Sequence, residues 1–240
     1  MKKGIGFKVI TIFPEIIGAY VSESILGKAC QKGLIEVGAI DVRDYSSDLK
    51  HHKVDDSPFG GGPGMVMSFP PIARAVRVAT EGKKKMVMGK KGQELALPKY
   101  NKTKTRVILF STRGKKLDTK MAKRLSKYEN IVMIAGRYEG VDERVAKYLA
   151  DEEVSIGDYV LTGGELPALV LMDTVARQIP GVLGRYESLE EKKGSYTVYT
   201  RPEMIEIKDR VKNKIKKLSV PKVLLSGNHQ KIENWRQGKD

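Results

Sequence analysis

The chain has 240 residues, 40% of them hydrophobic, which is enough for one large domain or two smaller ones around an ordinary core. Its 44 lysines and arginines exceed its 29 acidic residues and give a formal net charge of +15. This charge favours a polyanionic partner, nucleic acid first, although the lysine-rich surface of a thermophile or of a lysine-biased genome would give the same sum.

The N-terminus and the single cysteine indicate the compartment. The first residues pass directly into a strand-like run without a signal-peptide cleavage site, and no apolar run reaches the roughly 18 residues that a membrane span needs. We therefore expect a cytoplasmic protein with no membrane partner. Cys30 cannot form an internal disulfide, which fits a reducing compartment.

Strand-like and helical patterns alternate along the first two thirds of the chain. This alternation predicts an α/β domain built on a mostly parallel sheet. Further along, a β-like run through 156–161 leads to two glycines, and an apolar helical pattern begins directly after them. The other strand-like runs cover 7–13, 34–40, 106–111 and 130–135, and the helical patterns cover 14–32, 70–80, 117–127 and 141–150.

Three glycine-bearing loops follow predicted strands, at 110–114, 135–140 and 155–166. Ligands bind at the carboxyl ends of parallel strands, so we expect these loops to converge on one site. Neither a phosphate-binding P-loop nor the dinucleotide fingerprint GxGxxG is present, so the site is not built around a pyrophosphate. An adenosine with a non-phosphate tail would suit glycine-rich loops, and tight turns that serve only the fold are the alternative.

The chain changes character after Pro180 and Gly181, where a polar segment has the composition of an interdomain linker. We predict a catalytic domain at 1–181, a linker at 182–202 and a small basic helical domain at 203–240. A lysine-rich helix is expected near 203–218 and a last helix near 229–236. The lysines of the first helix, with basic clusters at 83–85 and 102–106, are typical of phosphate-contacting surfaces.

Five segments in order along the chain resemble the bacterial tRNA (guanine-N1)-methyltransferases of the SPOUT superfamily. The resemblance covers nearly the whole chain, and its motifs are long. The segments are VDDSPFGGGPGM (54–65), AGRYEGVDERV (135–145), SIGDYVLTGGELPALVLMDTVARQIPGVLG (155–184), YTRP (199–202) and VPKVLLSGNHQKIENWR (220–236).

This resemblance implies a fold and an activity that the residue patterns alone do not reach. It implies a parallel sheet with a deep trefoil knot, a homodimer, and transfer of a methyl group from S-adenosylmethionine to N1 of the guanine immediately 3′ of the tRNA anticodon. It also suggests assistance by magnesium, although no metal ligands are predicted from the sequence. A catalytically weakened RNA-binding protein with the same fold is the alternative, and a nucleotide-dependent enzyme acting on small molecules is a third.

The resemblance carries over a set of cofactor-binding residues from the three glycine loops. One of these loops departs from the family, because Thr112 and Arg113 stand where the family has proline and glutamine. The implied set is Leu109, Phe110, Ser111, Gly136, Tyr138, Glu139, Gly140, Ser155, Ile156, Gly157, Asp158, Tyr159, Val160, Leu161, Gly163, Gly164 and Pro167.

Methyl transfer to N1 requires removal of a proton and stabilisation of charge on the guanine. Arg177 lies four residues after Asp173, so a surface ion pair would explain both residues without any chemistry. The resemblance instead implies that Arg177 stabilises negative charge on the guanine O6. It also assigns a guanine pocket to Asp55, Asp56, Gly61 and Gly62.

The general base is where the sequence departs most from the family. The family uses a linker aspartate before YTRP, and Lys192 stands here in its place. Glu191, followed by Glu190, is the candidate that remains, and a solvated acidic pair is the alternative. We also expect a C-terminal part that is shorter than the family's, with the lysine-rich segment at 208–217 supplying tRNA affinity in its place.

Overall fold

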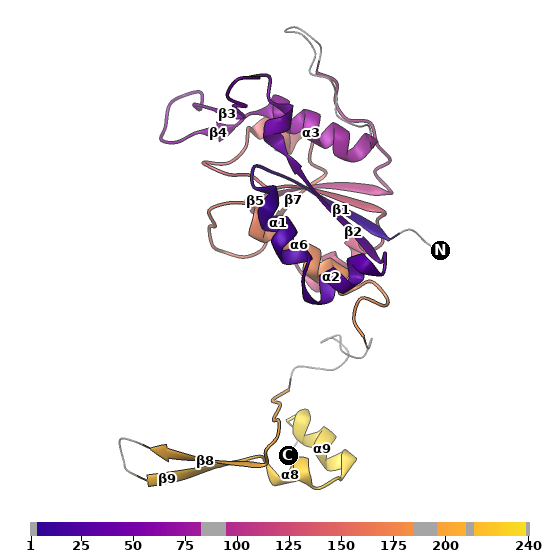
Figure 1. Cartoon of the computed structure of the whole chain (residues 1–240), viewed down its shortest axis with the longest axis vertical. Coiled ribbons are helices and arrows are strands. Elements are labelled where there is room, and N and C mark those ends of the chain that lie inside the picture. Colours follow the sequence, from indigo (N-terminus) through magenta and orange to yellow (C-terminus); the bar gives the residue numbers. More distant parts are fainter. Residues whose placement is uncertain (1–3, 83–94, 185–195, 210–213, 239–240) are drawn as a thin grey trace. The chain divides into compact units, whose positions relative to one another are not determined.

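The computed structural model describes residues 4–82, 95–184, 196–209 and 214–238 (Figure 1). The chain divides into two compact units, Met1–Tyr186 and Glu187–Asp240. None of the described helices is long and apolar enough to cross a membrane.

A five-stranded sheet forms the centre of the first unit. Its strand order is β2-β1-β6-β5-β7, and every neighbouring pair is parallel, which confirms the predicted parallel α/β architecture. The register between β5 and β7 shifts between Phe110 and Lys115, so the strand bulges inside the first glycine loop. The strands are β1 (Ile5–Thr11), β2 (Ile35–Asp41), β5 (Thr105–Lys116), β6 (Asn130–Ile134) and β7 (Glu152–Ser155).

Helices cover both faces of this sheet, because its central strands are apolar on both sides. In β6, Ile131 and Met133 join one hydrophobic core while Val132 and Ile134 join the other. Figure 1 shows α3 on one side and α1, α2 and α6 on the other. The first core packs under α1 (Pro14–Val21), α2 (Ser24–Gln31), α4 (Thr119–Leu125) and α6 (Glu165–Ala176), and the second under the 3-10 helix η1 (Val42–Tyr45), α3 (Phe69–Glu81) and α5 (Glu143–Tyr148).

The helix expected over 14–32 is two helices, with a break between α1 and α2. Glu23 is extended, and Ser24 has a left-handed φ of 53°. The break folds the chain back tightly, since a Cβ on Gly27 would lie 2.3 Å from the carbonyl oxygen of Ser22. Apolar periodicity continues across this turn, which is why the sequence indicated a single helix.

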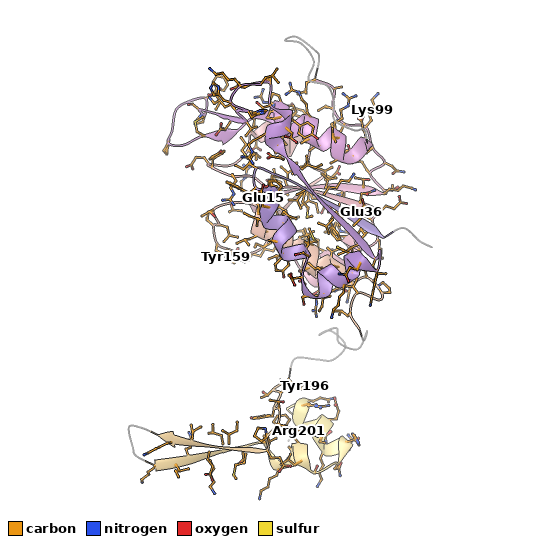
Figure 2. The ribbon with its side chains drawn as sticks, viewed as in Figure 1. Glu15, Glu36, Lys99, Tyr159, Tyr196 and Arg201 are labelled. Atoms are coloured by element: carbon orange, nitrogen blue, oxygen red, sulfur yellow. The ribbon has the colours of Figure 1, made fainter. Side chains whose placement is uncertain are left out.

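The β-like run at 156–161 is also not a strand. The strand β7 ends at Ser155, whose hydroxyl donates to the carbonyl oxygen of Gly157 at 2.9 Å and accepts from the Gly157 N–H at 3.3 Å. This local turn competes with further ladder pairing. Tyr159 and Val160 are 55% and 84% exposed, so their side chains lie on the surface of a loop. Figure 2 labels Tyr159 on this loop.

The second unit contains a hairpin where a lysine-rich helix was expected. The strands β8 (Met204–Asp209) and β9 (Lys214–Ser219) pair antiparallel and are followed by α8 (Lys222–Leu225) and α9 (His229–Arg236). Ile205 and Ile207 alternate with charged residues, and this period of two is typical of strands. The helix prediction rested on the high lysine content and did not take this period into account. The helix predicted near 229–236 is confirmed as α9.

Two chain segments of the first unit cross at Gly164. Its N–H donates to the carbonyl oxygen of Gly136 at 2.8 Å. A Cβ on Gly164 would lie 2.6 Å from the Cα of Ala135 and 2.9 Å from the Gly136 nitrogen, and backbone atoms cannot rotate away as a side chain can. Glycine is therefore needed here for space, since its φ of −85° is open to any residue.

We predict that Gly164→Ala lowers the free energy of unfolding by about 1–3 kcal/mol, the usual cost of overpacking. Gly38→Ala in β2 is the matched control, because a Cβ there meets no atom within 4 Å. Chemical denaturation of both variants measures the difference. If the two variants are equally stable, the backbone segments at Gly164 and Gly136 are not packed as closely as the structure shows.

Candidate active site

A pocket of about 480 Å³ opens at the carboxyl edge of the parallel sheet. Its walls come from the end of β5, the loop after β6 and the loop between β7 and α6. The predicted convergence of the three glycine loops is confirmed. The volume suits a small organic ligand.

Most of the sequence-predicted cofactor residues lie on this pocket. Asp158 is the exception, because its carboxylate pairs instead with the ammonium group of Lys116. The predicted residues that line the pocket are Leu109, Phe110, Ser111, Gly136, Tyr138, Glu139, Gly140, Ser155, Ile156, Gly157, Tyr159, Val160, Leu161, Gly163, Gly164 and Pro167.

Several lining residues were not in the predicted cofactor-binding set, and the charged ones among them matter most. Arg113 Nη2 contacts Glu143 Oε2 at 2.7 Å and lies 3.9 Å from Glu153 Oε2. That Glu153 oxygen is buried and has no hydrogen-bond partner among the described residues. No motif indicated Glu153, since its burial depends on strand pairing. The further lining residues are Thr112, Arg137, Val141, Ala146, Val154 and Thr162.

The predicted guanine-binding loop lies against the pocket loop after β6. Asp55 and Asp56 form the short strand β3 (Asp55–Asp56), which pairs with β4 (Val66–Met67). The N–H of Met67 donates to the carbonyl oxygen of Gly140 at 3.0 Å, and the N–H of Glu139 donates to that of Met65 at 3.1 Å. These bonds hold the two segments side by side.

The loop from β3 to β4 needs its glycines for shape. Gly61 and Gly62 have φ values of 79° and 129°, which side chains rarely adopt. Gly64 also carries a positive φ, and a Cβ on it would lie 2.6 Å from the side chain of Glu139. The side chain of Phe59 at the tip is fully exposed.

Tyr138 joins this loop to the pocket. It has a left-handed φ of 60°, and a hydrogen bond joins its side chain to that of Asp55. Burial, together with the charge and hydrogen bond of Asp55, raises the pKa of the Tyr138 hydroxyl, against a smaller opposite effect from Arg43 and Arg137. Backbone strain of this kind gathers at ligand sites.

A buried carboxylate connects three elements at the base of the pocket. Glu165, the first residue of α6, is 1% exposed. Its Oε1 accepts from Thr11 Oγ1 at 2.6 Å, and its Oε2 accepts from Arg137 Nε at 2.8 Å. The guanidinium of Arg137 also lies 4.7 Å from the ring centre of Phe13. The end of β1, the loop after β6 and the start of α6 are thereby fixed together.

Arg177 does not line the pocket of its own chain. It caps the C-terminus of α6, ten residues after the pocket residue Pro167, which corresponds to about 15 Å along the helix. The alternative ion pair with Asp173 is not formed among the described residues, where Asp173 instead accepts from the Tyr20 hydroxyl at 3.2 Å. Glu190 and Glu191 lie outside the described residues.

The described residues contain no group of three or more His, Cys, Asp or Glu side chains that could hold a metal ion. The acids near the pocket are instead separated or paired with arginines, as for Glu143 and Glu165.

The fold and the pocket together define an α/β protein whose glycine loops form a pocket at the carboxyl edge of a parallel sheet. Residues 5–240 match the family described as tRNA (Guanine-1)-methyltransferase TrmD. A tRNA (guanine-N(1)-)-methyltransferase of Ruminiclostridium cellulolyticum is 46% identical over 235 residues, covering 96% of this chain and 88% of that protein. One of Clostridioides difficile is 43% identical, covering 96% and 90%.

A solved structure agrees with these relatives. The crystal structure of tRNA (m1G37) methyltransferase from Aquifex aeolicus is similar with a TM-score of 0.72 and 39% sequence identity, over 97% of this chain and 87% of that one. The chain belongs to the TrmD family of tRNA (guanine-N1)-methyltransferases.

We predict that Glu165→Gln lowers the free energy of unfolding by about 2–3 kcal/mol. The glutamine side chain is neutral, so the Arg137 guanidinium would lose its counter-charge. A buried ion pair that loses one partner is strongly destabilised, and the cost is discounted here because Arg137 is partly exposed. Arg113→Gln is the control, since both partners of its pair with Glu143 are well exposed and its loss should leave the unfolding midpoint nearly unchanged. Equal midpoints for the two variants would contradict the role of Glu165.

Proposed function

We propose that this protein transfers a methyl group from S-adenosylmethionine to N1 of the guanine immediately 3′ of the anticodon in tRNA, in the cytoplasm. The observation that carries the proposal is the pocket, since glycine loops from three strand ends line it in a chain that belongs to the TrmD family. S-adenosylmethionine, when bound, supplies a methyl group activated by the adjacent sulfonium.

The pocket fits this ligand in two respects. Its glycines leave space beside the backbone, as at Gly140, where an added Cβ would meet no protein atom within 4 Å and would instead occupy room open to a ligand. The buried Oε2 of Glu153 lacks a hydrogen-bond partner among the described residues, and the amino group of S-adenosylmethionine would provide one. Within the described residues no acid cluster could hold magnesium, so the assistance by magnesium that the family resemblance suggests is proposed without an assigned binding site.

The loop between β3 and β4 is the proposed guanine pocket. It borders the cofactor loops through the backbone bonds of Met65 and Met67 and through Tyr138. Asp55 and Asp56 would accept hydrogen bonds from the guanine, while Gly61 and Gly62 would let the base approach the backbone.

We also propose that the active protein is a homodimer in which Arg177 of one subunit serves the pocket of the other. The position of Arg177 far along α6 from its own pocket supports this arrangement. A partly apolar surface supports it as well: α1 packs beside α6, and Ile16, Tyr20, Leu166 and Val170 on these helices are 38–55% exposed. Such patches are typical of subunit interfaces.

The trefoil knot implied by the family belongs to the same proposal. The tight crossing of Gly164 over Gly136 supports it, since the chain must pass closely through itself in a knot. An experimental electron density map that traces the chain from β6 to α6 tests this point.

Incorporation of labelled methyl into a tRNA transcript tests the activity. We expect transfer to a tRNA with guanine 3′ of the anticodon and none to the same transcript with adenine there. Competition by NAD and ATP for S-adenosylmethionine binding should be weak. A protein that binds S-adenosylmethionine and tRNA but transfers no methyl would be the RNA-binding alternative.

For Arg177→Ala we predict at least about a hundredfold loss of methyl transfer with little loss of cofactor affinity, because a charge partner of the transition state is removed. Sedimentation should show a dimer. Mixing this variant with Gly140→Val, which blocks the cofactor pocket, should restore part of the activity, because a mixed dimer then contains one complete site. If the subunits exchange and the mixture still shows no restored activity, Arg177 does not act on the pocket of the other subunit. An active monomer would contradict the proposal as well.

Glu191 is the proposed general base, with Glu190 as the second candidate, in place of the family's linker aspartate. We predict that Glu191→Gln reduces single-turnover methylation about a hundredfold or more, with tRNA and cofactor binding intact. Glu190→Gln is the matched comparison and should retain most of the rate. If both variants keep the parent rate, neither glutamate removes the N1 proton.

A further inference from the structure

The hairpin of β8 and β9 is an exposed, isolated ribbon. In the described part of the chain its strands pair only with each other. All described side chains of 204–208 and 214–219 are exposed, and Figure 1 shows the ribbon extending away from α8 and α9. A two-stranded hairpin with no helix or third strand behind it is only marginally stable in water, so a surface that covers it would stabilise it.

The strand register shows how its side chains divide between two faces. Ile205 lies opposite Leu218, and Ile207 lies opposite Lys216, all on one face. The other face carries the pair of Glu206 with Lys217, besides Met204, Lys208 and Ile215. Figure 2 shows side chains projecting from both sides of the ribbon. The apolar pair Ile205–Leu218 stabilises the ribbon near its base, as cross-strand pairs do.

Two of the four described lysines of the ribbon have no acidic residue opposite them. Lys217 pairs with Glu206 at 3.2 Å. Lys208 and Lys216 lie opposite isoleucines, and neither forms an ion pair with a described residue. Lys214 is exposed as well, and Asp209 lies opposite it in the strand register. Free ammonium groups on a projecting ribbon are well placed for a polyanion.

The other basic cluster described in the structure behaves differently. Lys102 pairs with Asp151 and Lys104 with Glu129, each at 2.9 Å, and Arg106 pairs with Glu152 at 2.5 Å. Its charges are therefore matched within the domain. Lys102 and Lys104 remain largely exposed, so this cluster stays a predicted phosphate-contacting surface, but each of its three charges has an acid beside it, unlike Lys208 and Lys216.

We propose that the β8–β9 ribbon is a phosphate-binding arm for the tRNA, with Lys208, Lys214 and Lys216 as its contacts. The inference rests on the proposed function for the identity of the RNA, and on charge complementarity for the choice of RNA over protein. Contacts to phosphates carry no sequence information, so the arm supplies affinity and position rather than choice of base.

The triple variant Lys208→Gln, Lys214→Gln, Lys216→Gln tests the arm in the full-length protein. We expect tRNA affinity to fall about tenfold or more at moderate salt. The slope of log affinity against log salt should become shallower by about 2–3, close to one unit for each lost phosphate contact. Methyl transfer at saturating tRNA should stay within about twofold of the parent, and S-adenosylmethionine binding should not change.

A matched control removes the same charge elsewhere. Lys28, Lys32 and Lys127 are exposed and lie on or after α2 and α4, before the amino ends of β2 and β6, at the edge away from the pocket. Their triple glutamine variant should retain nearly the parent affinity and salt slope. If the two triple variants weaken tRNA binding equally, the hairpin lysines contribute only through the net charge of the protein, and the proposal is wrong.

Two further outcomes separate this inference from its rivals. If the hairpin variant shifts the sedimentation of the dimer while tRNA binding is unchanged, the ribbon is a protein contact, and the proposal is wrong. Filter binding measures tRNA affinity without methyl transfer. The role of the hairpin lysines can therefore be tested even if the protein has no methyltransferase activity. Retained far-UV circular dichroism shows that the variant is folded.

Discussion

The carboxylate of Glu165 is the constraint on which the site depends. It is buried, and it accepts hydrogen bonds from Thr11 at the end of β1 and from Arg137 in the loop after β6. Gly164, the residue before it, passes within backbone contact of Gly136. The carboxylate of Glu165 and the absence of a side chain on Gly164 therefore allow the start of α6 to pack against the strand ends. The pocket walls follow from that placement.

The location of the pocket could be predicted because it follows from general rules of parallel sheets. Alternating patterns indicated the strand order in sequence, and carboxyl strand ends lie on one edge. Cofactor residues were then carried over from resembling motifs. Glu153 could not be found this way, since its isolated oxygen results from the pairing of β5 with β7 and from Arg113 taking Glu143 as its closer partner.

Two secondary-structure predictions were wrong, one for the run at 156–161 and one for the lysine-rich segment of the second unit. The run at 156–161 has the residues of a strand, but the hydroxyl of Ser155 satisfies nearby backbone groups and ends the ladder. In the second unit, the lysines led to the prediction of a helix, although Ile205 and Ile207 recur with a period of two. The structure has strands there, as this period indicates, and Ile205 pairs across the hairpin with Leu218. Helix propensity is weak beside such pairing, because it amounts to tenths of a kcal/mol per residue.

The charge of the chain shows why composition alone does not locate a binding surface. The 44 basic residues include some that acids neutralise, such as Arg106 with Glu152, and others that face solvent alone. Burial and the hydrogen bonds of two arginines act in opposite directions on Glu152, and their net effect lowers the pKa of its carboxyl, so this pair keeps its charges at neutral pH. Matched charges of that kind stabilise the domain and leave little field outside it. Exposed lysines opposite isoleucines, as in the β8–β9 ribbon, have no such partner, so their field extends into solvent and is screened only by salt.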